Sequence, residues 1–510
     1  MTLPHANYLK RMGRSAYSPR RAGMATMIVL LLLSITVGLS YSLLRSQGAT
    51  VQAQSNSNLD MLARQAAMTG YSTALRKMND ANWGGIAMVV TGSLSANQSF
   101  RANYATGDPS ITTTSANASD WPYRVTITSL GTAVDPARPT IASTYTVTAV
   151  VRLIPRQLAT VPTTLTSALQ FTVYQYANDT FELQLPCRVT GPVRLQGQLQ
   201  LCTSYPPSSA GQSRYLSDLN AMRSAGYGDW RPLNGPVSVP NSDISGSTQS
   251  VLNNQLGVSN INISATSATG WSFPGSVSTY QLYAGGQTYT VPTLQASLAN
   301  TSLAPDPRSN PLGLFYRSGS LTIGNNVSIS GTVIVSGDVT VTGTGVTLQA
   351  FSLPSLLGST QPVQLPAVVA SGSFKVESGV QAVVRGMIAV WNAFDVDPGT
   401  QSTTLDFQGR VICKGFQIEE RSEWNNTNSF LWSLYWSLFQ SQLSPPSQST
   451  TQYYPVWLGL FGLSPTPILT VAPETSSVTY QWKDASNTLY VPGSSDTGLV
   501  WSVQSWSESF

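Results

Sequence analysis

The stretch Gly331-Thr-Val-Ile-Val-Ser-Gly-Asp-Val-Thr-Val341 places apolar side chains at alternate positions on either side of a central glycine. The same pattern recurs in the 510-residue chain at residues 366–376, 386–396 and 409–418, and once earlier at residues 191–201. Successive side chains of a strand point to opposite faces of a sheet. Each copy therefore predicts a strand, a corner and a second strand that share one buried face.

The later copies begin at residues 331, 366, 386 and 409, so they leave room for one turn of about twenty residues with variable loops. We predict a mainly β protein whose core, residues 321–421, is a β-solenoid that resembles a parallel β-helix. Residues 187–203 form a first rung that stands apart, and residues 204–320 form an insertion or a side domain. A two-sheet sandwich with glycine-rich turns would show similar alternation and stays an alternative.

The N-terminal part predicts a membrane anchor. Residues 24–44 contain no charged side chain and are long enough to cross a bilayer as a helix. The basic leader before them, residues 1–23, should stay in the cytoplasm. We expect a single-pass inner-membrane protein whose bulk is periplasmic or at the cell surface. A cleaved secretory signal peptide is the alternative, but its apolar region usually has only about 7 to 15 residues.

Sequence periodicity divides the rest of the chain into four further regions. Apolar residues such as Leu59, Leu62, Ala66 and Met78 recur at helical spacing, so residues 45–80 continue the helix outside the membrane. Alternating strands over residues 81–186 predict an antiparallel β region that packs on this helix. We also predict an aromatic helix over residues 422–442 and C-terminal strands over residues 443–510. The helix would close the end of the solenoid, dock on these strands, or bind a partner.

A resemblance to a known family enters at the leader. The sequence Arg20-Arg-Ala-Gly23 directly before Met24-Ala-Thr-Met-Ile-Val-Leu resembles the class III signal of type IV pilins and pseudopilins. Residues 59–78 resemble the helix that follows the membrane in PilX-type minor pilins, and the likeness covers about residues 10–80. It implies that a prepilin peptidase cuts after Gly23, that Met24 becomes a methylated N-terminus, and that other pilin-like subunits are partners.

One position departs from the family pattern. Most pilins carry glutamate at the fifth residue of the mature helix, and this chain has Ile28 there. A subunit without this carboxylate resembles the tip pseudopilin of type II secretion. The resemblance therefore implies a place at a filament tip or a low copy number rather than a place in the main shaft.

Composition excludes several kinds of chemistry. The chain's one histidine, His5, lies in the leader, so the exported part has no residue for Ser-His-Asp or Cys-His catalysis or for an imidazole-bound zinc ion. We therefore expect no cofactor and no metal. A net charge of +4 that depends on the leader gives no basic patch for nucleic acid.

The three cysteines have two different predicted roles. Cys187 and Cys202 bracket the first rung, so we predict a disulfide between them. Cys413 takes an inward position of the last rung, where it acts as a small buried apolar side chain.

Four carboxylates form the candidate site. Glu377, Asp397 and Glu419 follow corresponding strands of three successive rungs, and Asp395 lies two residues before Asp397. In register they would stack at about 4.8 Å, where they could bind a hard cation or a glycan. The alternative is that these acids are simply solvated beside Lys375 and other basic residues.

Two functions compete on these grounds. The first is a structural, non-enzymatic minor pilin or pseudopilin-like subunit that displays the solenoid head outside the inner membrane, at a filament tip or against an extracellular surface or glycan. The second is an anchored or secreted β-helix polysaccharide hydrolase or lyase that uses carboxylates. Few ionisable residues and a polar, uncharged surface favour the first function.

Overall fold

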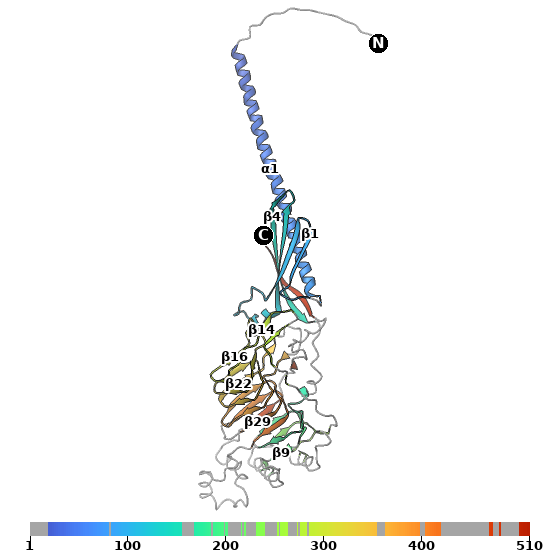
Figure 1. The fold of residues 1–510 in the computed structure, drawn as a ribbon, viewed down its shortest axis with the longest axis vertical. Helices are drawn as coiled ribbons and strands as arrows, with labels where there is room; N and C mark the ends of the chain where they lie inside the picture. The colour runs from blue at the N-terminus through green and yellow to red at the C-terminus, as the bar shows by residue number, and fades with distance from the viewer. Residues whose placement is uncertain are drawn as a thin grey trace, which may run out of the picture.

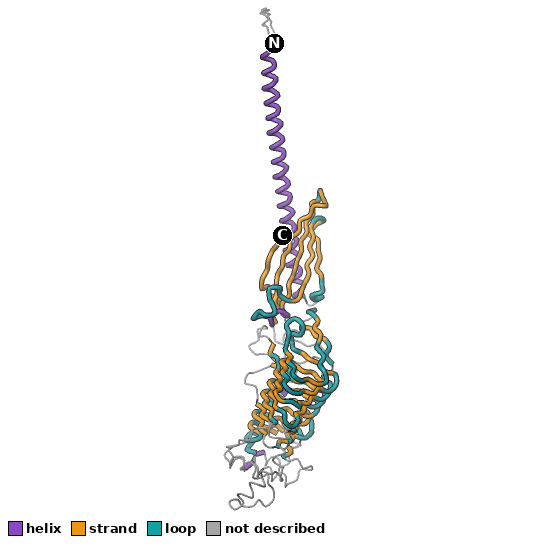
Figure 2. The backbone as a smooth tube through the Cα atoms, turned by 90° about the vertical axis from the view of Figure 1, so that its left-hand side faces the viewer, coloured by secondary structure: helices purple, strands orange, loops and turns teal. Residues whose placement is uncertain are grey.

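Three parts follow one another along one axis (Figure 1, Figure 2): one long helix, an antiparallel sheet, and a body made of three parallel sheets. This computed structural model describes residues 19–80, 83–155, 168–184, 187–197, 199–201, 216, 219–220, 231–239, 252–253, 256–263, 273, 276–282, 285–353, 363–397, 403–419, 469–472, 479–480 and 499–509. The predicted aromatic helix over residues 422–442 lies outside the described residues.

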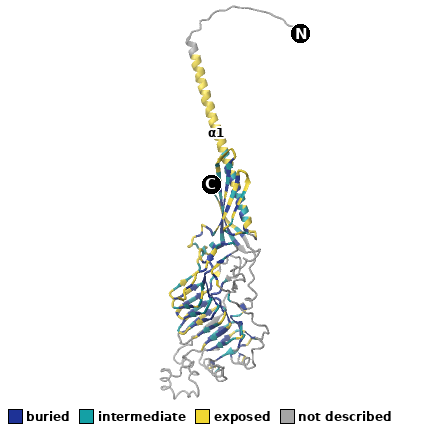
Figure 3. Ribbon diagram, viewed as in Figure 1, coloured by how far each residue is buried: buried dark blue, intermediate teal, exposed yellow. Residues whose placement is uncertain are grey.

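The N-terminal helix α1 (Pro19–Met78) is unbroken over 60 residues, also across the polar stretch at residues 48–58. At 1.5 Å per residue its length is about 90 Å. The half nearer the N-terminus is exposed, and the second half lies on the antiparallel sheet (Figure 3). The prediction of one long N-terminal helix is confirmed.

Five strands make the antiparallel sheet, in the order β1-β2-β3-β4-β35. Their bounds are β1 (Val89–Ser95), β2 (Gln98–Thr106), β3 (Arg124–Asp135), β4 (Arg138–Pro155) and β35 (Leu499–Ser509), and the short helix η1 (Ala118–Tyr123) leads into β3. Small side chains bring α1 close to this sheet, because Ala63 and Ala67 are completely buried against it. A Cβ at Gly131 of β3 would collide with the backbone of these same two residues, so only glycine fits there.

The last strand, β35, lies within the predicted C-terminal strand region, residues 443–510. It pairs antiparallel with β4, from Leu499 opposite Pro155 to Ser509 opposite Thr146. The antiparallel sheet is therefore built from both ends of the described chain. The predicted antiparallel region at residues 81–186 is wrong at its end, because the strands after β4 join parallel sheets.

Three parallel sheets form the larger part of the molecule, and together we call them the stack. Sheet I contains β12 (Ile261–Ile263), β11 (Val237–Val239), β8 (Val193–Arg194), β5 (Val173–Gln175), β31 (Val411–Cys413), β28 (Ile388–Val390), β25 (Val368–Ala370), β20 (Thr332–Val335) and β17 (Leu314–Arg317). Sheet II contains β15 (Ser297–Leu298), β18 (Leu321–Ile323), β21 (Val339–Val341), β26 (Phe374–Val376), β29 (Ala393–Val396), β32 (Gly415–Ile418), β6 (Phe181–Leu183) and β9 (Leu199–Gln200).

Sheet III contains β10 (Leu233–Asn234), β7 (Cys187–Thr190), β33 (Leu469–Ala472), β30 (Thr404–Gln408), β27 (Gln381–Arg385), β22 (Thr344–Gln349), β19 (Ser328–Ser330) and β16 (Ser302–Leu303). The remaining elements are the hairpin of β13 (Thr279–Gln281) and β14 (Thr288–Thr290), the small sheet of β23 (Ser352–Leu353), β24 (Val363–Gln364) and β34 (Thr479–Tyr480), and the short helix η2 (Ala168–Gln170).

The chain visits the three sheets in rotation. Strands β17, β18 and β19 belong to sheets I, II and III, and β20, β21 and β22 repeat this order one strand further along each sheet. Each predicted two-strand copy supplies the strands of sheets I and II. The third strand of each turn was not predicted, although it alternates too, as in β27 with Ala382 and Val384 buried.

The order of turns in the stack differs from the order in the sequence. Val173 of β5 pairs with Val411, Phe181 of β6 with Phe416, and Cys187 of β7 with Leu469. The copy at residues 191–201 thus lies beyond the last copy. The predicted insertion at residues 204–320 also contains strands of the stack, because β10 to β12 and β15 to β17 belong to the three sheets.

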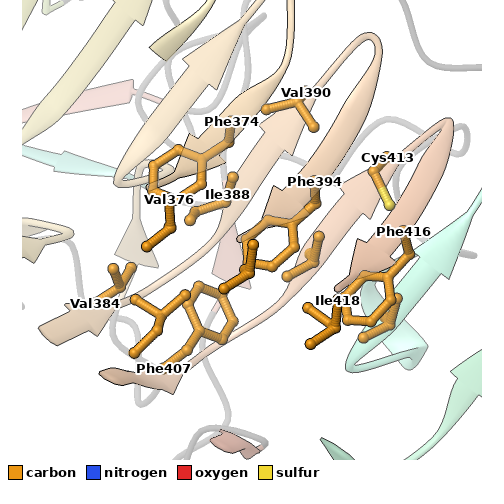
Figure 4. Packing of buried hydrophobic residues seen from close by; sticks show 14 of the residues in the cluster. Phe374, Val376, Val384, Ile388, Val390, Phe394, Phe407, Cys413, Phe416 and Ile418 are labelled. Carbon is orange, nitrogen blue, oxygen red and sulfur yellow. The ribbon is translucent and has the colours of Figure 1, made fainter. Parts of the chain in front are cut away.

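Aromatic rings line the interior of the stack. The ring centroids of Phe374 and Phe394 are 5.5 Å apart, those of Phe394 and Phe416 are 5.4 Å apart, and those of Phe416 and Phe181 are 4.9 Å apart. Figure 4 shows the first three of these rings one above another, beside Phe407. Equivalent positions in successive turns repeat the same side chain, so flat rings stack with offsets that favour their contact.

The antiparallel sheet and the stack share one apolar cluster. Tyr123 at the end of η1, with Val125 and Leu153 of the antiparallel sheet, packs in it against Leu314 and Ile334 of the stack. The Ile86 amide also donates a hydrogen bond to the Gly285 carbonyl at 2.9 Å. Burial of this surface from both sides fixes the stack to the sheet.

Candidate functional site

The first half of α1 is long and apolar enough to cross a membrane. In the described structure its large apolar side chains have no cover, with Leu30 66% and Leu33 59% exposed. A water-exposed strip of this size is unfavourable by about 25 cal/mol per Å², so a bilayer is its expected surrounding. The predicted processing residues Gly23 and Met24 both lie within α1.

The second half of α1 is hydrogen-bonded to the antiparallel sheet along its length. Gln98 donates to the Leu62 carbonyl at 2.7 Å, Ser129 to the Ala67 carbonyl at 2.8 Å, and Tyr104 to the Ala74 carbonyl at 3.0 Å. Each of these carbonyls also accepts a hydrogen bond within the helix, so it accepts hydrogen bonds from two donors. The helix and the sheet therefore form one unit.

The last strand is bound to α1 by charge. Arg64 Nε lies 2.8 Å from Glu508 Oε2, and the Tyr145 hydroxyl donates to the same carboxylate. The hydrogen bond from Arg64, and next the one from Tyr145, holds the pKa of Glu508 below its usual range. Near the other end of β35, the Trp501 amide donates to Asn79 Oδ1 at 3.2 Å.

The predicted acidic residues come together on sheet II. Lys375, Asp395, Gln417 and Glu182 stand opposite one another in β26, β29, β32 and β6. Glu377, Asp397 and Glu419 directly follow the last apolar residue of β26, β29 and β32. Their amides donate hydrogen bonds to backbone carbonyls of the preceding turn at 2.9 to 3.0 Å. We call Glu377, Asp395, Asp397, Glu419 and Glu182 the acidic cluster.

Crowding changes the protonation of this cluster. Loss of solvent, followed by repulsion from Asp395, Asp397 and Glu182, raises the pKa of Glu419 to about 7. Loss of solvent also raises the pKa of Asp395, with Lys375 opposing the rise. Like charges at strand spacing disfavour one another's ionised form, so the cluster holds a proton near neutral pH.

Glu182 was missed by sequence reasoning. It lies in β6, far from the other acids in the chain, and it joins them only because β6 pairs with β32. The one available signal was the alternation of apolar and polar side chains in Phe181-Glu-Leu183, which indicates a strand. This alternation does not show the order of the turns.

A hard cation would find no ready-made ligand set in the acidic cluster. Among the described residues, no three His, Cys, Asp or Glu side chains are grouped so that they could hold a metal ion. The acids form an open column on a sheet, whereas a hard cation needs oxygens that converge from several sides.

The cysteines in the described residues are buried thiols. Cys187 and Cys413 both face the interior of the stack, and burial raises the pKa of each thiol. Cys202 lies outside the described residues, so the disulfide between Cys187 and Cys202 stays a prediction.

Comparisons with known proteins find similarity among solved structures. No protein-family profile and no curated protein matches the sequence. Among solved structures, the chain is similar to the competence-associated pilin ComZ from Thermus thermophilus, with 12% identity and a TM-score of 0.20, over 88% of this chain and 98% of that one.

Proposed function

We propose that this protein is a non-enzymatic, pilin-like structural subunit, anchored by α1 in the inner membrane, that displays a β-solenoid head outside the cytoplasm. The main support is α1 itself, whose exposed apolar half continues without a break into a half that is bonded to an antiparallel sheet. Such a helix joins a membrane segment rigidly to an exported body.

The solenoid part of the proposal rests on register. Every strand pair within the three large sheets is parallel, and the chain moves from sheet I to sheet II to sheet III and back in successive turns. A coil of this kind buries one continuous interior. It would present a long polar surface to a partner subunit, an extracellular surface or a glycan.

The pilin-like part rests on the leader and the helix. A prepilin peptidase would cut after Gly23, and Met24 would become the methylated N-terminus. Ile28 takes the place of the usual glutamate, so the subunit would sit at a filament tip or in low copy number among other pilin-like subunits, PilX-type minor pilins included.

The test is mass spectrometry of the N-terminus of protein taken from native membranes. The proposal predicts a start at Met24 with a methylated amine, and a retained leader in a Gly23→Leu variant. The matched control is Gly38→Ala, inside the membrane segment and open on all sides, which should be processed normally. An intact leader in the unaltered protein, or a start near Ala53, would contradict the proposal.

A second candidate is glycan hydrolysis by the acidic cluster. Glu419 with a pKa of about 7 beside Asp397 one strand away is the pairing that a general acid and a carboxylate nucleophile need. Release of reducing sugar by the protein, and its loss in Glu419→Gln but not in Asp406→Asn on sheet III, would establish this activity. If the protein releases no reducing sugar from any polysaccharide tested, this second candidate function is contradicted.

A further inference from the structure

The corners where the chain passes from sheet I to sheet II form a row along the stack. Residues 336–338 join β20 to β21, and residues 371–373 join β25 to β26. Their sequences, Ser-Gly-Asp and Ser-Gly-Ser, contain only small or polar side chains. A Cβ at Gly372 would collide with Asp338 Oδ1, and this oxygen accepts a hydrogen bond from the Ser373 amide at 2.8 Å. These corners are therefore small, polar and tightly packed.

The row changes at Trp391. Residues 391–392, Trp-Asn, join β28 to β29, and the tryptophan is 41% exposed. Among the described residues of the stack, it is the one large apolar residue that is exposed. In the next turn a single residue, Lys414, separates β31 from β32. An exposed aromatic corner thus lies beside a corner of one residue.

Tyr176 holds this tryptophan from two turns away. It follows β5, which pairs with β31, and β31 pairs with β28. The ring centroids of Tyr176 and Trp391 are 5.7 Å apart, and the Tyr176 hydroxyl donates a hydrogen bond to the Trp391 carbonyl. Tyr176 itself is only 9% exposed. An aromatic surface held in this way loses little conformational entropy when a ligand covers it.

Polar groups of three kinds lie around the aromatic pair. Asn392 is exposed next to Trp391, and its carbonyl accepts the Lys414 amide at 2.8 Å. Lys414 Nζ lies 3.6 Å from Asp179 Oδ2, with both side chains partly exposed. The opposite charges of this pair balance each other, and a surface pair contributes little stability, so both groups are available to a ligand. We call Tyr176, Asp179, Trp391, Asn392 and Lys414 the aromatic corner.

The size of the aromatic corner selects the kind of ligand. A stable protein interface covers about 800 Å² of each partner around an apolar centre. At 41% exposure a tryptophan offers about 100 Å². The preceding corners add only serine, glycine and aspartate. The exposed apolar surface is therefore too small for the centre of a protein interface.

One sugar ring matches this surface. A pyranose ring has a face of C–H groups that can stack on an aromatic ring, and a rim of hydroxyls that both donate and accept hydrogen bonds. An amide, an ammonium group and a carboxylate beside the ring are suitable partners for such hydroxyls. Because the charges of Lys414 and Asp179 balance, the corner favours a neutral sugar over an acidic or a basic one.

We propose that the aromatic corner binds a neutral sugar unit of an extracellular glycan, with Trp391 stacked on the sugar ring and Asn392, Lys414 and Asp179 bonded to its hydroxyls. This inference deepens the proposed function and rests on it, because only an exported stack meets such a glycan. Binding here requires no reaction by the acidic cluster, and it gives the displayed stack a ligand.

Saturation-transfer difference NMR on the full-length protein in deuterated detergent tests the proposal. The probes are neutral hexasaccharides from cellulose, amylose, chitin and mannan, with polygalacturonate as a charged comparison. Trp391→Ala removes the stacking ring, Trp391→Tyr keeps a ring, and Lys414→Ala removes one hydroxyl partner. The matched control is Trp506→Ala on β35, which removes a tryptophan that is 53% exposed outside the stack.

At least one neutral hexasaccharide is expected to bind, with the largest signals on its C–H protons. Trp391→Ala should weaken its binding about tenfold or more, and Lys414→Ala about fivefold. Trp391→Tyr should stay within about threefold of the parent protein, which separates loss of the ring from loss of the fold. Trp506→Ala should bind as the parent does.

Three results would overturn the proposal: no binding of any neutral probe, unchanged binding in Trp391→Ala, or tighter binding of polygalacturonate than of every neutral probe. A photoreactive phenylalanine at position 391 that cross-links to a second protein in native membranes would mark a protein interface instead, and would also overturn it. Glycan binding by purified protein does not depend on N-terminal processing. An intact leader would therefore contradict the proposed function without changing this result.

Discussion

Arg64 on α1 and Glu508 on β35 are 444 positions apart in the chain, yet the guanidinium and the carboxylate share two contacts, at 2.8 and 2.9 Å. The first helix and the last strand are thus joined directly. The strands of the stack lie between α1 and β35 in the sequence, but they belong to other sheets. The unit formed by α1 and the antiparallel sheet therefore includes strand β35 as well as the strands that follow α1.

Removal of this ion pair should loosen β35. In Glu508→Gln we expect faster amide hydrogen exchange across residues 499–509, while exchange in β3 stays as it was. The Glu508 pKa is lowered in the folded state, so its contribution is present above the usual carboxyl range and is lost as pH falls through the folded value. After correction for the intrinsic rate, amide hydrogen exchange of residues 499–509 should therefore rise at acidic pH in the parent protein. The rise should be smaller in the variant.

The matched control for this experiment is Ser507→Ala, an exposed neighbour on the same strand. It keeps the carboxylate and should leave the exchange of β35 unchanged. Unaltered protection in Glu508→Gln would mean that backbone pairing with β4 alone holds the strand.

The order of turns predicts which phenylalanines are energetically coupled. Phe181 and Phe416 stack at 4.9 Å although they lie in distant parts of the sequence. A double-mutant cycle with both residues changed to alanine should give a coupling of about 0.5 to 1.5 kcal/mol in urea denaturation. Phe181 and Phe374 lie in turns that do not adjoin, and their cycle should be additive. Coupling in the second cycle and none in the first would refute this order of turns.

Proton binding by Glu419 should appear as pH-dependent stability. Its folded pKa of about 7 lies above the ordinary 4.5, so its contribution to stability is fully present below about 4.5 and is lost as pH rises through 7. Neighbouring groups displace part of the solvent around the Glu419 carboxyl, but the residue stays exposed by surface area, so solvent screening limits the effect to about 1 kcal/mol.

The variant Glu419→Gln should flatten the dependence of the urea midpoint on pH between 5 and 8, as followed by tryptophan fluorescence. Glu377→Gln, an exposed member of the same column, serves as the control and should keep the slope of the parent protein. An unchanged slope in Glu419→Gln would assign the titration to another group.

Buried thiols should react only when the stack opens. Cys413 and Cys187 are completely buried and have raised pKa values, so little thiolate forms at pH 8. Iodoacetamide followed by peptide mass spectrometry should leave Cys413 unmodified in the folded protein and modify it in urea. Rapid labelling of Cys413 without denaturant would contradict its place inside the stack. The same map, run without reductant, tests the predicted bond between Cys187 and Cys202.

Local patterns were enough to predict the strands but not their number per turn. Alternation at Val333, Val335, Val339 and Val341 predicts two strands, which form β20 and β21 with these residues buried. The third strand, β22, begins after a glycine-containing turn and buries only Val346 and Leu348. Two apolar positions in a polar segment are a weak signal, and the pairing that makes them a strand lies in other turns.

The pairing of strands that are far apart in the sequence could not be predicted from the sequence. The periodicity of Leu59 to Met78 predicted the helix face correctly because a helix is a local structure. The return of β35 to β4 and the place of β6 beyond β32 depend on partners hundreds of residues away. The sequence of residues 499–509 would fit the edge of any sheet equally well. The alignment of Glu377, Asp397 and Glu419 was predicted because their turns are consecutive, whereas Glu182 was not.

The last strand closes the sheet on which the first helix lies, so the stack is carried as an insertion. Thr148 on β4 stands directly opposite Ser507 on β35, which a disulfide can test. The pair Thr148→Cys and Ser507→Cys should form a cross-link in high yield under mild oxidation, read as a linked peptide by mass spectrometry. Thr148→Cys with Gln504→Cys, out of register on the same strand, should not. A missing cross-link in the first pair, or equal yields in both, would contradict the account.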